Sequence, residues 1–317
     1  MVDVKFFAFT VDDEMLEIKG VKSFELSRES DAPCDGLRLW FTCDKALDEI
    51  YRLEMKINGR LVFNGNCDTQ RETLGASGYN CFIYARSSAC ILTDSEAKPD
   101  SFFSPSARAI FEKYVKDSGF SYDMPETVYS GQYMIAKGTS LFGALDGFVF
   151  AVTGKHIYVT PFNEIKLLES ERIVCLNSKI ISEKRVINRG DLLCGVDYKL
   201  SSEENYAHHR VSEFMKRKKV TARVMKNLSS LTPLQREQSL SSIMAQANNE
   251  YVSYEVDVCG PVFAELCDRI EYDSFAFDDL GELRLNGITY LYDSKGFHTR
   301  LKLIRITDLE ELSYVDE

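Results

Sequence analysis

The sequence is short of positive charge and of proline, and it lacks any long apolar run. Its 38 lysines and arginines against 49 aspartates and glutamates leave a net charge of −11, whereas contacts with nucleic-acid phosphates need a surplus of cations. Seven prolines and 12% aromatic residues argue against a disordered chain. The most apolar stretch, 141–153, is short and carries Asp146, so we expect no membrane insertion and no specific nucleic-acid binding.

The nine cysteines are odd in number and form no C-x-x-C pair, which argues against a disulfide scaffold and against a thiolate zinc site. Several lie within apolar strand patterns, where a free cysteine behaves as a small hydrophobic residue. The first residues show no basic region followed by an apolar stretch, so no signal peptide is predicted. We therefore expect reduced thiols, no metal, no cofactor and a protein that folds in the cytosol.

The 317 residues suffice for two or three domains, and their patterns predict an α+β, mainly β fold. Residues 1–87 read as short strands between turn signals, with an Asn58-Gly59 hairpin, and predict an N-terminal β-barrel domain. Residues 88–170 carry helix signals among strands and predict a middle α/β domain. Strands return over 171–317 and predict a second, similar β-barrel domain.

The second barrel carries an insertion at about 203–250, with a basic segment and a helix. A second Asn-Gly pair, Asn286-Gly287, predicts another hairpin, and its place at the end of the block raises the odds of a duplicated barrel. The basic cluster is either a solvated face, which is the favoured interpretation, or an electrostatic contact with an acidic partner. Its members are Lys216, Arg217, Lys218, Lys219, Arg223 and Lys226.

No catalytic or metal-binding motif is complete in the sequence. Residues 136–140, Ala-Lys-Gly-Thr-Ser, hold the residue types of a phosphate-binding loop in the wrong order and without its glycine-rich lead-in. His208 and His209 are adjacent, so on a strand their side chains would point to opposite sides and on a helix they would not share a face. No ligand partner stands at a suitable spacing, and a solvated loop is the favoured interpretation. His156 and His298 are isolated, and we interpret them as ordinary strand residues.

Two other functions stay open at this point. Acidic residues are plentiful enough to supply the carboxylate pair of a peptidoglycan hydrolase, but such a pair must lie about 5 to 10 Å apart across a cleft, which a sequence does not test. No G-x-S-x-G turn is present to position a serine nucleophile. A carbohydrate- or receptor-binding module is the second alternative.

The stretch GYNCFIYARSSACILTDSEA, residues 78–97, begins as a strand and ends as a short helical turn. Ser87 and Ser88 follow Arg86 and would suit a nucleophile, but no base is indicated as a partner. The other interpretation is structural, because Asp94 lies one short turn beyond Arg86, close enough to form an ion pair. We predict that Arg86 and Asp94 make a structural corner, which fixes the angle at which the chain leaves the barrel.

Four stretches of the chain follow one another in a recognisable order: YARSSACILTDSEA, SARAIFEKYVKDSGF, YMIAKGTSLFGALDGFVFAVTGKHIYVTP and QREQSLSSIMAQANNEYVSYEVDVCG. With them the chain resembles the baseplate or tail hub proteins of contractile-tailed phages, the late control protein D family, and their relatives in phage-like bacteriocins and contractile injection systems. The order of elements covers most of the chain. The chain lacks the family's clear proline-glycine loop and an appended oligosaccharide-fold or lysozyme domain, which makes it similar to short hubs of Gram-positive phages and prophages.

The resemblance implies a structural protein rather than an enzyme. It implies a homotrimeric ring that caps the tail tube and connects it to the central spike protein, with the tape-measure protein and other baseplate proteins nearby. The expected location is the virion tail or baseplate, or a bacteriocin particle, after folding and assembly in the cytoplasm of the bacterial host. Two barrels per chain would let a three-fold ring present six nearly equivalent surfaces to a six-fold tube.

Overall fold

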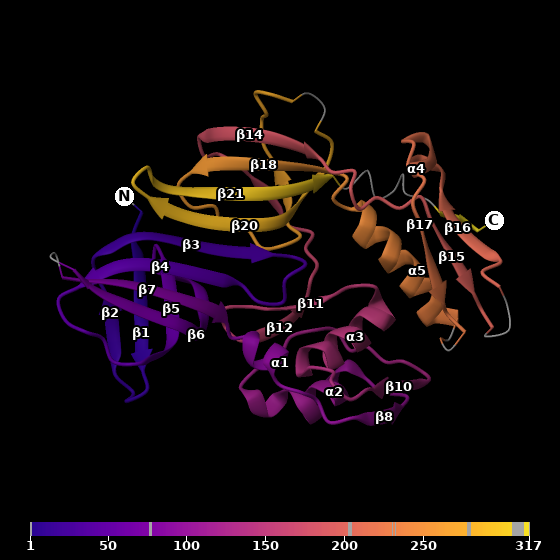
Figure 1. Cartoon of the computed structure of the whole chain (residues 1–317), viewed down its shortest axis with the longest axis horizontal. Helices are drawn as coiled ribbons and strands as arrows, with labels where there is room; N and C mark the ends of the chain where they lie inside the picture. Colours follow the sequence, from indigo (N-terminus) through magenta and orange to yellow (C-terminus); the bar gives the residue numbers. More distant parts are fainter. Residues whose placement is uncertain are drawn as a thin grey trace.

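The computed structural model of the protein describes residues 2–75, 78–201, 205–229, 231, 233–277, 280–305 and 314–316. It consists of one large curled sheet, a middle unit of helices and short strands, and a smaller α/β unit beside the sheet (Figure 1). This architecture confirms the predicted fold class, which is mainly β with an α/β insertion and a helix-containing insertion in the C-terminal β region.

The N-terminal part of the large sheet is made by β1 to β7, whose side chains alternate between core and solvent. On β4, for example, Leu37 and Leu39 are buried and Arg38 is exposed, as in a strand with one face on the core. The predicted Asn58-Gly59 hairpin is confirmed, because both residues have positive φ, 50° and 79°, between β5 and β6. The strands are β1 (Val4–Thr10), β2 (Met15–Ile18), β3 (Val21–Glu29), β4 (Gly36–Cys43), β5 (Ile50–Ile57), β6 (Arg60–Gly75) and β7 (Gly78–Ser87).

The C-terminal part of the sheet ends in a hairpin whose turn lies away from the predicted place. Asn286 and Gly287 lie inside β20 at a β-bulge, and the turn comes just before Gly296. The predicted hairpin is wrong because tertiary contacts hold Asn286 in the strand: its Oδ1 accepts from Ser30 Oγ at 2.5 Å and its Nδ2 donates to Glu250 at 2.9 Å. The strands are β13 (Ile173–Cys175), β14 (Ile180–Ile187), β18 (Val252–Cys259), β19 (Arg269–Glu271), β20 (Leu283–Asp293) and β21 (Gly296–Arg305).

The two parts of the sheet are joined by antiparallel pairing of β3 with β20, from Glu29 opposite Gly287 to Phe24 opposite Tyr292. Along its main path the sheet has the strand order β14-β18-β21-β20-β3-β4-β7-β6-β5-β1-β2. Buried side chains from both parts belong to one hydrophobic cluster. The two β regions therefore share one continuous sheet and one core, while the domain boundaries after 87 and after 170 stay predictions.

The middle unit packs two helices against short strands. Serine side chains cap the start of both helices, and a glycine ends the second. Ser106 Oγ accepts from the Ala109 N–H at the start of α2, and Ser140 Oγ accepts from the Gly143 N–H at the start of α3. Gly154, with φ 71°, ends α3. The elements are α1 (Cys90–Asp94), β8 (Asp100–Phe103), α2 (Ala107–Tyr114), η1 (Lys116–Ser118), β9 (Ser121–Tyr122), β10 (Gln132–Ile135), α3 (Leu141–Thr153), β11 (Ile157–Val159) and β12 (Glu164–Leu167).

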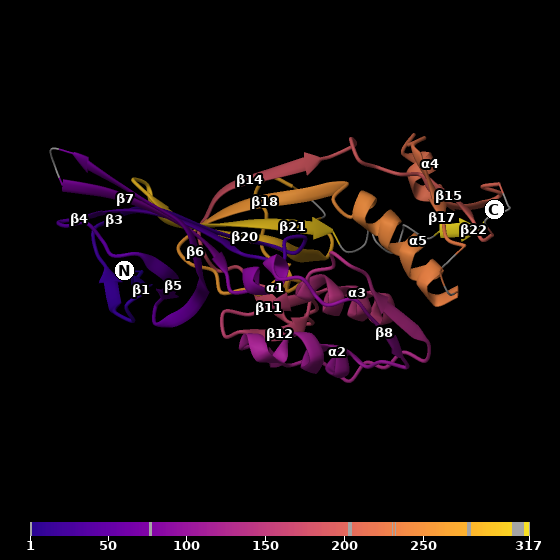
Figure 2. The same ribbon diagram turned by 60° about the horizontal axis from the view of Figure 1, so that its bottom comes forward.

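The smaller unit has a sheet of order β17-β15-β16-β22, with α5 between it and the rest of the molecule (Figures 1 and 2). It includes β15 and β22, which lie outside the predicted insertion of about 203–250. None of the helices in the described ranges is long and apolar enough to cross a membrane. The elements are β15 (Gly195–Lys199), β16 (His208–Ser212), α4 (Glu213–Arg217), β17 (Arg223–Asn227), α5 (Pro233–Asn248) and β22 (Tyr314–Asp316).

The buried side chain of Arg28 on β3 links the two parts of the large sheet. Its Nε lies 2.9 Å from Asp35 Oδ2, its Nη2 donates to the Val62 carbonyl oxygen at 2.9 Å, and its Nη1 lies 3.6 Å from Glu265 Oε2. Burial lowers the pKa of Arg28, but the carboxylates of Asp35 and Glu265 outweigh it and raise the pKa above its usual value. The guanidinium therefore stays charged and binds three segments at once.

We expect Arg28→Ala to lower the free energy of unfolding by about 3–5 kcal/mol, because it leaves buried carboxylate and carbonyl groups without their partner. The matched control is Arg38→Ala on β4, since Arg38 pairs with Glu25 and the two side chains are 49% and 37% exposed; its loss should be below about 1 kcal/mol. Urea unfolding followed by far-ultraviolet circular dichroism measures both. Equal losses for the two variants would contradict the role given to Arg28.

Candidate functional site

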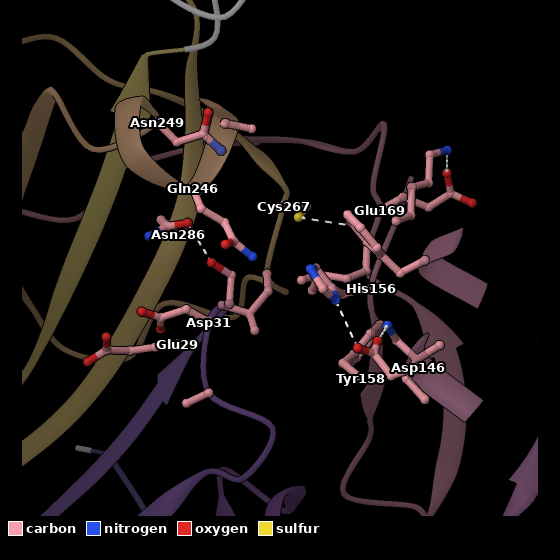
Figure 3. Close-up of a pocket in the computed structure, with 18 of the residues that line it drawn as sticks. Glu29, Asp31, Asp146, His156, Tyr158, Glu169, Gln246, Asn249, Cys267 and Asn286 are labelled. Atoms are coloured by element: carbon pink, nitrogen blue, oxygen red, sulfur yellow. Dashed lines mark hydrogen bonds and ion pairs between the residues drawn. The ribbon is translucent and has the colours of Figure 1, made fainter. Parts of the chain in front are cut away.

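A cleft of about 1140 Å³ lies where the large sheet, the middle unit and α5 meet. Figure 3 shows Asp31 and Asn286 on the wall made by the sheet, and Asp146 and His156 on the wall made by α3 and the start of β11. Ten aspartates and glutamates line the cleft, against three arginines and lysines. Its lining is therefore strongly acidic, and it is the place in the molecule to look for the carboxylate pair of a hydrolase.

Most of these carboxylates are held in ion pairs within the chain. Glu237 on α5 is bound by both Nη atoms of Arg210, at 2.6 and 2.8 Å, and Glu250 lies 2.8 Å from Lys302 Nζ. The carboxylates of a glycosidase must face the substrate, whereas these are bound to cations of their own chain. The pairs at the cleft are Asp146 with His156, Glu169 with Lys155, Glu237 with Arg210, Glu250 with Lys302, and Glu265 with Arg60.

Asp35 is the acidic residue of this lining for which burial raises the pKa. The Arg28 guanidinium, 2.9 Å away, acts against burial and lowers it. Because Asp35 is locked in the Arg28 ion pair at the join of the sheet, it is a structural carboxylate rather than a proton donor to a substrate.

The cleft also brings together a histidine, an aspartate and a cysteine, which the sequence pattern did not reveal. His156 Nδ1 lies 2.9 Å from Asp146 Oδ2, and the His156 ring stacks on Phe150 with centroids 4.4 Å apart. The Cys267 thiol, however, donates to the Leu168 carbonyl oxygen at 3.7 Å, and burial raises its pKa. A thiol held protonated is a poor nucleophile, so the trio does not form a nucleophile-base system.

Arg86 forms the expected ion pair with Asp94, and Asp68 is a third member of the group. Arg86 at the end of β7 binds Asp94 with two hydrogen bonds, Nη1 to Oδ1 at 3.0 Å and Nη2 to Oδ2 at 2.7 Å. Its Nε also donates to Asp68 on β6 at 2.5 Å. Asp68 lies at a β-bulge between Cys67 and Thr69, and no local pattern in the sequence indicates that it would reach Arg86.

The two serines beside this corner are buried and serve as hydrogen-bonding groups. Ser87 Oγ accepts from the Asp35 N–H at 3.0 Å, and Ser88 Oγ donates to Asn163 Oδ1 at 2.5 Å. These bonds tie the end of β7 to the residue directly before β4 and to the turn between β11 and β12. Neither serine contacts a base, in agreement with a structural corner. That the Arg86–Asp94 pair fixes the exit of the chain stays a prediction.

The six predicted basic residues lie on two elements of the smaller unit. Lys216 and Arg217 lie on α4, Lys218 and Lys219 directly follow it, and Arg223 and Lys226 lie on β17. Three of them have partners within the chain. Lys216 pairs with Glu213 at 2.8 Å, Lys218 lies over the Phe214 ring, and Arg223 pairs with Asp197 at 3.1 Å. Contact with an acidic partner through this cluster stays a prediction.

The adjacent histidines lie on β16 rather than in the expected solvated loop, and they have different neighbours. His209 Nδ1 lies 2.8 Å from Asp197 Oδ1, whereas the ring of His208 stacks on Tyr198. Asp197 therefore accepts hydrogen bonds from both His209 and Arg223. Burial acts to raise the pKa of Asp197, but these two partners outweigh it and the pKa is lowered. In the described part of the chain, no group of three or more histidine, cysteine, aspartate or glutamate side chains is arranged to hold a metal ion.

No family model matches the sequence, and no curated protein matches it. The fold does match solved structures. The tail protein from Neisseria meningitidis MC58 and the 43 kDa tail protein of prophage MuSo2 from Shewanella oneidensis each have a TM-score of 0.76, at 13% identity over 98% of this chain and 99% of theirs. The E. coli c3393 protein, a component of the type VI secretion system, has a TM-score of 0.60, at 10% identity over 92% of this chain and 74% of its own.

The chain therefore has the fold of phage tail proteins over nearly its whole length. The c3393 protein itself exhibits structural similarity to the T4 bacteriophage tail proteins gp27 and gp5. The resemblance drawn from the sequence, to tail hub proteins and to contractile injection systems, is confirmed at the level of the fold. At sequence identities of 10% to 13%, these matches show similarity of the fold alone.

We expect Arg86→Ala to lower the free energy of unfolding by about 1–3 kcal/mol, between the ranges for exposed and buried ion pairs. Asp68→Asn should cost more than Asp94→Asn, because the Asp68 side chain is 26% exposed and that of Asp94 is 57% exposed. The control is Arg108→Ala, which removes an exposed pair with Glu126. Unchanged melting of Arg86→Ala would show that the corner pair is dispensable.

The His156–Asp146 pair predicts a pH-dependent contribution to stability. The hydrogen bond that His156 donates to Asp146 raises the pKa of His156 against the effect of burial, so the folded state keeps a proton that the unfolded state releases at lower pH. The contribution is complete below the unfolded pKa of about 6.5 and is lost as the pH rises through the raised pKa.

The test of this contribution compares the chain with His156→Gln, which does not titrate. The difference in melting temperature between the two proteins should be larger at about pH 5.5 than at about pH 8.5. These values lie about one unit below and about two units above the ordinary histidine pKa. His298→Gln serves as the control for loss of a histidine elsewhere on the sheet. A difference that is constant with pH, or that grows toward high pH, would contradict the pair.

Proposed function

We propose that the chain is a structural baseplate or tail hub protein, which forms a homotrimeric ring that caps the tail tube and connects it to the central spike. The observation that carries this proposal is the match with two tail proteins over 98% of this chain and 99% of each of theirs. A match over both full lengths means that no large part of this chain is left over for a separate activity.

The chemistry of the cleft favours a structural role over catalysis. Its carboxylates are mostly engaged in ion pairs, its cysteine is held as a thiol, and the serines of the corner are bound to other residues. A peptidoglycan hydrolase would need a carboxyl group of raised pKa facing a substrate. A carbohydrate- or receptor-binding module is the other alternative, and it would act as a separate chain rather than as part of a ring.

The partners that fit this role are other copies of the chain, the tail tube protein, the central spike protein, the tape-measure protein and further baseplate proteins. The location that fits is the virion tail or baseplate, or a bacteriocin particle, with folding and assembly in the cytoplasm of the bacterial host. The basic cluster from Lys216 to Lys226 is then a contact for an acidic partner, and the Arg86–Asp94 corner sets the direction of the middle unit relative to the sheet.

The test is removal of the chain from a producing host, followed by electron microscopy of the particles. Without it we expect no complete tails, and a tagged copy supplied in trans should restore them and be found at the end of the tube. Tails of normal number and shape without the chain would overturn the proposal.

A second measurement addresses the alternatives. Incubation of the purified protein with labelled peptidoglycan should release no soluble fragments above the level of a heat-treated sample. Reproducible release would favour a hydrolase. A monomer that binds a glycan tightly and is absent from tails would favour a receptor-binding module.

A further inference from the structure

The large sheet ends in two strands that each pair on one side only. β14 is the first strand of the sheet and pairs with β18, and β2 is the last and pairs with β1; in the described residues neither has a partner strand on its other side. Figure 1 shows β14 and β2 far apart, at opposite limits of the sheet. Free strand edges expose backbone donors and acceptors, and they invite pairing with another chain unless something covers them.

The β14 edge is cationic and exposes large apolar side chains. Ile181 is 55% exposed and Ile187 is 52% exposed. The carboxylate of this segment, Glu183, is turned toward its own chain, because it accepts hydrogen bonds from Ser274 Oγ and the Phe275 N–H. The cationic side chains of the segment 178–190 are Lys179, Lys184, Arg185 and Arg189.

The β2 edge has the opposite charge and a similar apolar component. Val11 is 51% exposed and Met15 is 62% exposed, on the turn from β1 and at the start of β2. Lys19 is the one cation of the segment 11–19. Its four carboxylates are those of Asp12, Asp13, Glu14 and Glu17, all exposed.

We infer that the β14 edge of one copy docks against the β2 edge of a second copy, head to tail. Two β14 edges would set cations against cations, and two β2 edges would set carboxylates against carboxylates, so the charges oppose both two-fold arrangements. The unlike edges attract each other, and the exposed isoleucines can pack on Val11 and Met15. A head-to-tail contact repeats and closes into a ring when its rotation allows. This inference rests on the proposed function only for the number of copies in the ring.

The experiment reverses the charge of each edge in the full chain and measures self-association by sedimentation velocity. Lys179→Glu/Arg185→Glu changes the β14 edge and leaves Lys184, which pairs with Glu255 on β18. Asp12→Lys/Glu14→Lys changes the β2 edge and leaves Asp13, whose φ of 62° does not suit lysine. Each change should weaken association at least about tenfold, because like charges then meet at the contact.

A chain with both edges reversed should recover association, since the edges are complementary again, and this recovery excludes misfolding as the cause of the losses. The control Lys116→Glu/Lys137→Glu makes the same change of net charge on the middle unit and should associate like the unchanged chain. Association of the unchanged chain should weaken at high salt, because exposed charges are screened.

A one-to-one mixture of the two single-edge variants should also associate, because each edge then finds an opposite charge on the other chain. Strict alternation of two kinds cannot close a ring with an odd number of copies, so the mixture should form pairs or even-numbered assemblies instead of the native one. A mixture that stays monomeric would contradict the contact.

Three further results would overturn the inference. They are an unchanged chain that is monomeric at every concentration, a Lys179→Glu/Arg185→Glu variant that associates normally, and a doubly reversed chain that does not recover. These results bear on the contact between copies, whereas the place of the chain in the tail is tested by particle assembly. A variant that associates normally and still enters tails would remove the edge contact and keep the hub, whereas normal tails without the chain would remove the hub whatever the association.

Discussion

The structure depends on one buried charge, the guanidinium of Arg28 at the join of the large sheet. A buried cation is tolerable only when its partners are all in place, and here the partners come from three segments: Asp35 after β3, the carbonyl of Val62 on β6, and Glu265 from the C-terminal β region. Glu265 also holds Arg60 at 2.7 Å. The Arg28 network is therefore complete only when the N-terminal and C-terminal β regions meet, which favours the one continuous sheet that both regions form.

The position of this join determines where the remaining features of the molecule lie. With β3 and β20 in the middle of the sheet, its free edges fall at β14 and β2, far from each other. The turn after β3 and the bulge in β20 meet through Ser30 and Asn286, and they form the sheet wall of the acidic cleft. The positions of the cleft and of the two charged edges thus follow from the same strand order.

Local features of the chain could be predicted from the sequence, and long-range ones could not. The Asn58-Gly59 turn and the Arg86–Asp94 pair each join neighbours in the chain, so their geometry follows from spacing. The same reasoning failed at Asn286, because hydrogen bonds with Ser30 and Glu250 hold this residue within the strand. Both partners are far from Asn286 in the sequence, so a local strand pattern does not predict these contacts. The Arg28 network and the pairing of His156 with Asp146 in the cleft are of the second kind, since sheet register and packing create them.

The cleft shows how the same residue types can hold a structure or perform a reaction. A catalytic site keeps an acid, a base or a thiolate available at the pH of its work, at some cost to stability. In this chain Asp146 accepts bonds from His156 and from the N–H of Ile157, which joins α3 to β11, and Cys267 is kept as a thiol. Each group is committed to a neighbour in the fold. A protein that sets the positions of other proteins in an assembly needs this commitment, because its usefulness lies in fixed distances between surfaces rather than in reactive groups.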